Sequence, residues 1–225
     1  MEDISRKISP KEIGKRFSQA YNSYRNWAKP QKEAVEILLE NFGSFVERDD
    51  TVLDAGAGVG LLTEKLLEIC NKVFACDLSL ASLNKNPARR RAFTCNIEYL
   101  PLKDGSLDWV ASNFVLHWCD YKKAVKEFIR VSKKGFFFSV PVQGSLKGLG
   151  FPFPYGEEIL EVVRPQRWFV KEIEIPFRGR EFLLFFKKTG TGFNPNKTLS
   201  AFKILKNPNL IENYSFKVLF VLKMF

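Results

Sequence analysis

The stretch VLDAGAGVG at residues 52–60 constrains the fold of this chain more than any other part of it. The apolar run Thr51–Leu53 is typical of a buried strand, and glycines then follow at every second position from Gly56 to Gly60. Glycine adopts backbone conformations closed to other residues and lets the chain approach a ligand closely. Because Leu61–Leu67 has helical spacing, the stretch predicts a strand, a ligand-binding turn and a helix N-terminus that faces an anionic group.

Two common phosphate-binding motifs do not fit this turn. In the dinucleotide motif G-x-G-x-x-G the third glycine would stand where Leu61 is, and no G-x-x-x-x-G-K-S/T loop is present. What the chain does contain is D-x-G-x-G-x-G from Asp54 to Gly60. A glycine-rich turn in some other α/β domain is the alternative interpretation of this motif alone.

The ends of the next two predicted strands carry polar residues that suit a nucleoside. Asp77 stands about 20 residues after the glycines, the interval at which an acid reaches a pair of ribose hydroxyls. It could instead cap the helix beginning near Leu80, although Ser79 is available for that cap. After the third strand, Asn96 and Ile97 could supply the acceptor, backbone donor and apolar surface that an adenine requires.

Strands alternate with helices along the chain, which predicts an α/β fold with a mainly parallel sheet of seven strands and helices on both faces. The expected strands are 51–53, 72–76, 92–95, 107–113, 135–140, 168–177 and 216–225. The expected helices are 10–42 with a break at Pro30 and an end at Gly43, then 61–67, one from residue 80, 121–131, 157–163, 180–188 and 199–205. One domain of 225 residues is expected, divided into a helical cover at 1–45, a cofactor-binding half at 46–141 and a substrate-side half at 142–225.

Composition excludes several classes of protein. There is no run of 18 apolar residues that could span a membrane, and residues 1–7 lack the apolar core of a signal peptide. The four cysteines, at positions 70, 76, 95 and 119, form no C-x-x-C pair, so neither a zinc site nor a disulfide framework is expected and a cytoplasmic location follows. The net charge of +10 indicates either an acidic partner or simply a basic solvent-exposed surface.

The motifs together resemble the class I S-adenosylmethionine-dependent methyltransferases, and more narrowly the malonyl-acyl-carrier-protein O-methyltransferases of biotin synthesis. The likeness includes the glycine turn, Cys76–Ser79, Asn96–Pro101, His117-Trp118-Cys119 and Val142–Leu146. The chain departs from the family at Asn96, where an acid is usual, and in a shorter segment between Gln143 and Phe153. It also lacks the Pro-Pro tetrad and the Pro-Cys nucleophile that go with two kinds of nucleic-acid base methylation.

The resemblance implies which residues bind each ligand. Residues expected to bind S-adenosylmethionine are Gln31, Asp54, Gly56, Ala57, Gly58, Asp77, Leu78, Asn96, Ile97, Glu98 and Asn113. Residues expected to contact the substrate are Phe17, Tyr21, Tyr24, His117, Trp118 and Gln143, with a basic side chain pairing with the substrate carboxylate. His117, the single histidine, is expected to line the pocket rather than act as a general base.

The implied reaction is methylation of the free carboxylate of malonyl carried on an acidic acyl carrier protein, which leaves S-adenosylhomocysteine. A carboxylate is ionised at pH 7 and needs no general base, so no catalytic acid–base pair and no metal are expected. The alternatives are another small-molecule carboxylate or a quinone precursor as the acceptor, an RNA methyltransferase, and a non-catalytic protein that has kept the fold. Nucleic acid and membrane are not expected as partners.

Overall fold

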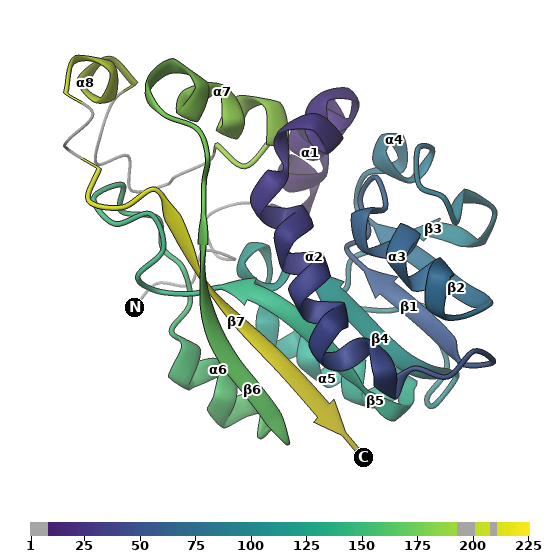
Figure 1. Ribbon diagram of the computed structural model, residues 1–225. Helices are drawn as coiled ribbons and strands as arrows, with labels where there is room; N and C mark the ends of the chain where they lie inside the picture. Colours follow the sequence, from purple (N-terminus) through teal and green to yellow (C-terminus); the bar gives the residue numbers. More distant parts are fainter. Residues whose placement is uncertain (1–8, 193–200, 208–210) are drawn as a thin grey trace.

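The computed structural model describes residues 9–192, 201–207 and 211–225 of the chain. A seven-stranded sheet with the order β3-β2-β1-β4-β5-β7-β6 runs through its centre (Figure 1). The strands are β1 (Thr51–Ala55), β2 (Lys72–Asp77), β3 (Ala92–Thr94), β4 (Leu107–Asn113), β5 (Ser132–Pro141), β6 (Arg167–Glu174) and β7 (Ser215–Met224). Strands β1 to β5 pair in parallel, and β7 is antiparallel to both β5 and β6. The predicted mainly parallel sheet is confirmed.

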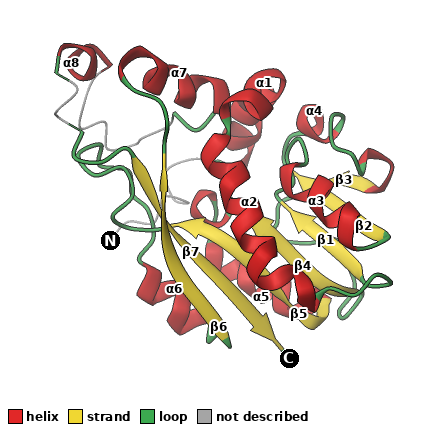
Figure 2. Ribbon diagram, viewed as in Figure 1, coloured by secondary structure: helices red, strands yellow, loops and turns green. Residues whose placement is uncertain are grey.

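Helices cover both faces of this sheet (Figure 2). They are α1 (Pro10–Trp27), α2 (Lys29–Phe42), α3 (Leu61–Ile69), α4 (Leu80–Leu83), α5 (Tyr121–Val131), α6 (Gly156–Val163), α7 (Gly179–Thr189) and α8 (Ala201–Lys206). Leu199 and Ser200, predicted to begin the last of these, lie outside the described residues. None of the helices in the described ranges is long and apolar enough to cross a membrane.

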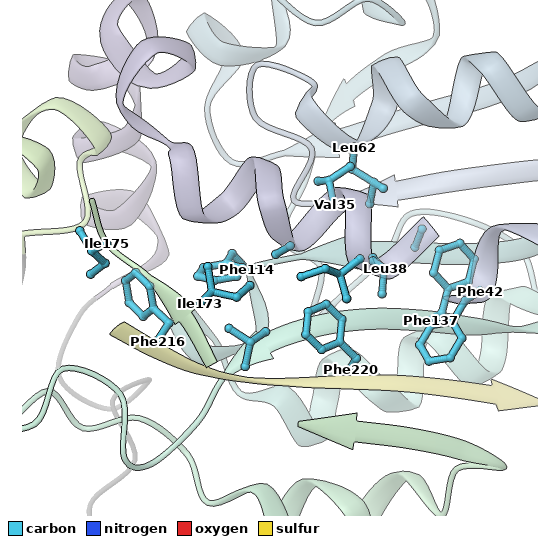
Figure 3. Packing of buried hydrophobic residues seen from close by; sticks show 14 of the residues in the cluster. Val35, Leu38, Phe42, Leu62, Phe114, Phe137, Ile173, Ile175, Phe216 and Phe220 are labelled. Carbon is cyan, nitrogen blue, oxygen red and sulfur yellow. The ribbon is translucent and has the colours of Figure 1, made fainter. Parts of the chain in front are cut away.

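Successive strand residues point into two separate cores, which explains why the strands are apolar on both faces. Val52 and Phe137 pack beneath α2 and α3, as Figure 3 shows for Phe137, whereas their neighbours Leu53 and Phe136 pack against α5 and α6 on the other face. The period of two in a strand produces this alternation. It fixes the register of the sheet, because a slip by one residue would exchange the two faces.

The predicted break in the N-terminal helices occurs just before Pro30. Helix α1 ends at Trp27, and α2 begins at Lys29 with Pro30 in its first turn, where the missing N–H is not needed for the helix. The two helices then have different surroundings. Helix α2 packs on the sheet, whereas α1 continues past the strand ends and lies between α4 and α7 (Figure 1).

Two strand boundaries differ from the prediction. Strand β1 continues through Asp54 and Ala55, which pair with Ala75 and Cys76 of β2, so the turn begins two residues later than the apolar run indicated. This change lengthens the part of the sheet that supports the glycine turn. Strand β6, at the edge of the sheet away from that turn, ends at Glu174 rather than at Phe177, because its partner β7 begins opposite Glu174.

Candidate functional site

The glycine turn folds back against the end of β2. The backbone N–H groups of Gly56 and Ala57 both donate to the carbonyl oxygen of Cys76, at 2.9 Å each. Gly56 has a φ of +77°, and a Cβ added to it would lie 2.4 Å from Cγ2 of Val115. Only glycine therefore fits at this position without displacing its neighbours.

A buried hydrogen-bond network ties Asp54 to the turn. The Thr63 hydroxyl donates to Oδ2 of Asp54 at 2.6 Å, and Nδ2 of Asn86 donates to the Thr63 oxygen at 3.0 Å and to the Gly58 carbonyl at 3.2 Å. Burial, with a contribution from the nearby Asp77 carboxylate, raises the pKa of Asp54 to about 7. Neither Thr63 nor Asn86 was predicted as a site residue, because their local sequences do not distinguish them from ordinary surface polar residues.

Asp77 occupies the place that its spacing predicted, at the end of β2. Its Oδ2 accepts from the Gly58 N–H at 2.9 Å and its Oδ1 accepts from the Ser79 N–H at 2.7 Å. Burial raises the pKa of this carboxyl despite those two hydrogen bonds. The Ser79 hydroxyl caps α4 by accepting from Ser82 N–H, so Asp77 is not the helix cap. A carboxylate has about four acceptor sites, which leaves room for two more donors.

These elements surround a cavity, here called the first cavity, with about 930 Å³ of empty space including its opening to solvent. Among the described residues that line it, Asp54 and Asp77 are the charged ones, and no Lys or Arg is present. Its lining residues are Ile13, Phe17, Tyr21, Tyr24, Asp54, Gly56, Ala57, Gly58, Val59, Leu61, Leu62, Asp77, Leu78, Ser82, Cys95, Asn96, Ile97, Asn113, Phe114, Val115, Trp118 and Cys119. The first cavity is therefore negative, although the chain has a net charge of +10.

Two of the predicted ligand-binding amides in the first cavity already make internal hydrogen bonds. Oδ1 of Asn96 accepts from the Glu98 N–H at 3.0 Å. The Asn113 side chain donates to the Gln31 carbonyl at 3.1 Å and accepts from the Ser139 hydroxyl at 2.5 Å. Asn113 thus fastens the beginning of α2 to the ends of β4 and β5, a positioning contact that its place in the sequence did not indicate.

Four predicted site residues lie outside the first cavity, namely Glu98, Gln143, Gln31 and His117, and the last two line a different cavity. The carboxylate of Glu98 accepts from the backbone N–H of Asp120 at 3.0 Å, just before α5. Gln143 is exposed in the loop after β5, where its N–H donates to the Pro154 carbonyl. Gln31 is buried next to a different cavity.

Helix α1 brings Phe17, Tyr21 and Tyr24 to the first cavity, as predicted from their spacing. Phe17 meets Trp118 edge to face, with ring centroids 5.8 Å apart. Arg25 connects α1 to α3 and to the glycine turn, since it donates to Glu64 of α3 at 2.7 Å and to the Val59 carbonyl at 3.3 Å. Helix α1 is therefore one wall of the first cavity.

A second cavity adjoins the first and shares Phe17, Tyr24, Phe114 and Trp118 with it. It has about 530 Å³ of empty space including its opening. The other residues that line it are Gln31, His117, Leu146, Phe151, Pro152, Phe153, Phe186, Thr191 and Phe216. Burial lowers the pKa of His117 to about 3, so its imidazole is neutral at pH 7.

Phe114 stands in the wall between the two cavities with a φ of +58°. A bulky side chain rarely adopts this left-handed conformation, which costs of order 1–3 kcal/mol and is found most often at functional sites. Its ring packs edge to face on Phe216, with centroids 5.3 Å apart. No local pattern in the sequence indicates this strain.

Among the described residues, no group of three or more His, Cys, Asp or Glu is placed to hold a metal ion. None of the four cysteines, which all lie in the described ranges, forms a disulfide bond.

Comparison with known proteins shows which of them this chain resembles. Residues 53–140 match the family model described as a methyltransferase domain. The malonyl-acyl-carrier-protein O-methyltransferase of Hamiltonella defensa is 36% identical over 148 residues, which is 63% of this chain and 57% of that protein. The enzyme of the same name from Buchnera aphidicola is 35% identical over 146 residues, 62% of this chain and 58% of that protein. The chain therefore spans well under two thirds of the length of these relatives.

The solved structure of a geranyl diphosphate methyltransferase in complex with S-adenosylmethionine superimposes with a TM-score of 0.59 at 18% identity, covering 86% of this chain and 85% of that one. At this identity the match shows the fold alone. The chain thus has the class I methyltransferase fold, matches the model of a methyltransferase domain over residues 53–140, and resembles the malonyl-acyl-carrier-protein O-methyltransferases in sequence.

Proposed function

We propose that this protein is an S-adenosylmethionine-dependent methyltransferase that methylates the free carboxylate of malonyl carried on an acyl carrier protein. The observation that carries the proposal is the charge of the first cavity. Its described lining contains the carboxylates of Asp54 and Asp77 and no Lys or Arg, beside a glycine turn at the strand ends. This lining suits a nucleoside with a positive sulfonium and a positive amino group, and it is unfavourable for a pyrophosphate.

The residues present fit such a ligand in a specific arrangement. Asp77 would accept from the ribose hydroxyls with its remaining acceptor sites, and Asn96 and Ile97 would lie against the adenine. Asp54 and the glycine turn would face the amino-acid end. When bound, S-adenosylmethionine supplies an electrophilic methyl group. The carboxylates of Asp54 and Asp77 would stabilise its positive charge.

The acceptor carboxylate needs no deprotonation at pH 7. What the chain must do is align the oxygen with the methyl group and exclude water. Phe17, Tyr24 and Trp118 line both cavities and are placed to do so. Burial, together with the Asp77 carboxylate, raises the pKa of Tyr24, so its phenol stays protonated. His117, neutral and buried, lines the acceptor side as a hydrogen-bonding group.

The net charge supports an acidic carrier protein as partner. The chain carries +10, whereas the described lining of the first cavity carries only carboxylates, so the positive charge must lie elsewhere. A positive exterior steers an acidic partner toward docking. The names of the relatives, which act on malonyl-acyl-carrier protein, support the same partner. A cytoplasmic location is part of this proposal.

Transfer of a labelled methyl group from S-adenosylmethionine to malonyl-acyl carrier protein tests the proposal. The expected product is a base-labile methyl ester on the carrier, and succinyl- and acetyl-acyl carrier protein serve as controls for chain length and for the free carboxylate. Tight binding of S-adenosylmethionine with no transfer to the malonyl carrier would overturn the assignment of the acceptor while leaving that of the methyl donor.

One observation favours a second candidate, methylation of another small molecule such as a quinone precursor. The second cavity is lined largely by aromatic rings and has no charged residue among those described, so the basic side chain expected to pair with a substrate carboxylate is not found there. A panel of aromatic hydroxy compounds and carboxylic acids in the same labelling assay separates the two candidates.

A further inference from the structure

The second cavity contains two buried polar atoms that have no hydrogen-bond partner among the described residues. They are Oε1 of Gln31, whose residue is 2% exposed, and Nδ1 of His117, whose residue is 7% exposed. A buried polar atom without a partner costs about 1–3 kcal/mol of stability, and native proteins tolerate few of them. Two such atoms in one cavity point to a ligand that supplies the missing partners.

Both residues are held in place by their surroundings. The Gln31 backbone is tied to Asn113 through its carbonyl, at 3.1 Å. The His117 ring packs against Trp118 and Phe153, with centroids 4.9 Å and 5.7 Å away. The backbone of Gln31 and the ring of His117 are therefore fixed on the wall of a largely apolar pocket.

The lining decides what kind of group can bind there. An ionised carboxylate would lose its hydration without meeting a cation, at a cost of several kcal/mol. Gln31 Oε1 is an acceptor and requires an N–H or O–H donor from the ligand, whereas a neutral imidazole offers one donor and one acceptor. A secondary amide carries one donor and one acceptor and no charge, so it matches both residues.

We propose that Gln31 and His117 bind a neutral secondary amide on the arm that carries the acyl group, while the reacting carboxylate stays at the wall shared by the two cavities. This inference rests on the proposed function and explains how the protein would select its substrate. The second cavity rejects the charged end of the acceptor and accepts the uncharged arm, so the substrate enters in one orientation. The inference also assigns Gln31 to the binding of the acceptor, whereas the sequence resemblance assigned it to the binding of the cofactor.

Two small malonyl thioesters of equal length test this. One is the thioester of N-acetylcysteamine, which has a secondary amide two carbons from sulfur, and the other is the thioester of 1-pentanethiol, which has none. The wild-type protein should prefer the amide probe by about tenfold in kcat/KM, the value of a well-placed pair of hydrogen bonds. Gln31→Leu should reduce that ratio to about one, and His117→Phe should reduce it as well.

Gln19→Leu is the matched control, since Gln19 is exposed on α1 and lines neither cavity. It should keep the tenfold ratio. Because Gln31→Leu removes a buried amide oxygen that has no hydrogen-bond partner, the free energy of unfolding of the variant should equal or exceed that of the wild type. If Gln31 had only a structural role, Gln31→Leu would instead lower the free energy of unfolding and leave the ratio between the probes unchanged.

Two results would overturn the inference. The first is an unchanged ratio in a folded Gln31→Leu or His117→Phe variant, and the second is a loss of S-adenosylmethionine affinity in Gln31→Leu with the ratio kept. If neither probe is methylated, transfer to malonyl-acyl carrier protein still decides the proposed function. Calorimetry with S-acetyl-N-acetylcysteamine then decides the inference, since binding that depends on Gln31 supports it and no binding overturns it.

Discussion

Replacing Asp54 by Asn removes a buried ionisable group from the first cavity while keeping the size and shape of the side chain. The Thr63 hydroxyl, which donates to Asp54 at 2.6 Å, can still donate to the amide oxygen. The substitution therefore isolates the effect of charge. It should make the protein more stable, because a buried negative charge destabilises the folded chain. It should also weaken the binding of S-adenosylmethionine, because that charge attracts the positive ligand.

The size of the effect follows from the pKa of Asp54, which rises from its ordinary 3.8 to about 7 on folding. Below about pH 4 the carboxyl is protonated in both the folded and the unfolded chain, so it does not change the free energy of unfolding. Between about pH 4 and pH 7 only the unfolded chain loses the proton, and each pH unit removes about 1.4 kcal/mol from the free energy of unfolding. Above about pH 7 the loss is complete, at about 4 kcal/mol.

Urea unfolding of the wild type and Asp54→Asn at pH 5 and pH 8 measures this. The stability gained by the variant should be about 3 kcal/mol larger at pH 8 than at pH 5. Affinity of the wild type for S-adenosylmethionine should rise with pH up to about 7, since the ligand is positive and favours the ionised carboxylate, whereas the variant should show no such rise. The reasoning would be refuted if the stability gained by Asp54→Asn did not depend on pH, or if the variant were less stable than the wild type at pH 8.

Four further perturbations test other parts of the site. Gly56→Ala should lower the free energy of unfolding by roughly 2 kcal/mol and abolish cofactor binding, because the new Cβ would lie 2.4 Å from Val115; Gly179→Ala, where the φ is +53° but no atom lies within 4 Å, is the control and should leave binding intact. Tyr24→Ala should reduce turnover far more than cofactor affinity, and the reverse result in paired kinetics and titration would remove Tyr24 from the acceptor side. His117→Gln, which keeps a hydrogen-bonding side chain, should leave turnover largely unchanged, whereas a loss of about 10²-fold or more would show that a proton-transfer catalyst had been removed. Raising the ionic strength from about 0.05 to 0.5 M should raise the KM for malonyl-acyl carrier protein but not the KM for a small malonyl thioester. Equal effects on both KM values would mean that charge does not guide docking.

The sheet could be predicted because its strands are apolar on both faces and end at polar residues. Asp54, Asp77 and the glycine turn lie close in sequence to the strands that position them, so their spacing was enough to bring them to one edge of the sheet. The same reasoning placed Phe17, Tyr21 and Tyr24 over that edge, since a helix repeats every 3.6 residues.

Other parts of the site depend on contacts between distant segments, which no local pattern records. Asn86 reaches Gly58 and Thr63 across 28 and 23 positions in the chain. Gln31 could be assigned to the cofactor from its resemblance alone, but α2 packs on the sheet and turns this side chain toward the second cavity. Phe114, whose φ is positive, packs against Phe216, more than 100 residues later in the chain.

Calorimetric titration of the wild-type protein with S-adenosylmethionine, and separately with a nicotinamide dinucleotide, tests the central claim most directly. The negative lining made by Asp54 and Asp77 predicts one S-adenosylmethionine bound per chain, weakened at least tenfold in Asp77→Asn, and no binding of the dinucleotide. Binding of the dinucleotide in place of S-adenosylmethionine, or binding of neither, would contradict the account.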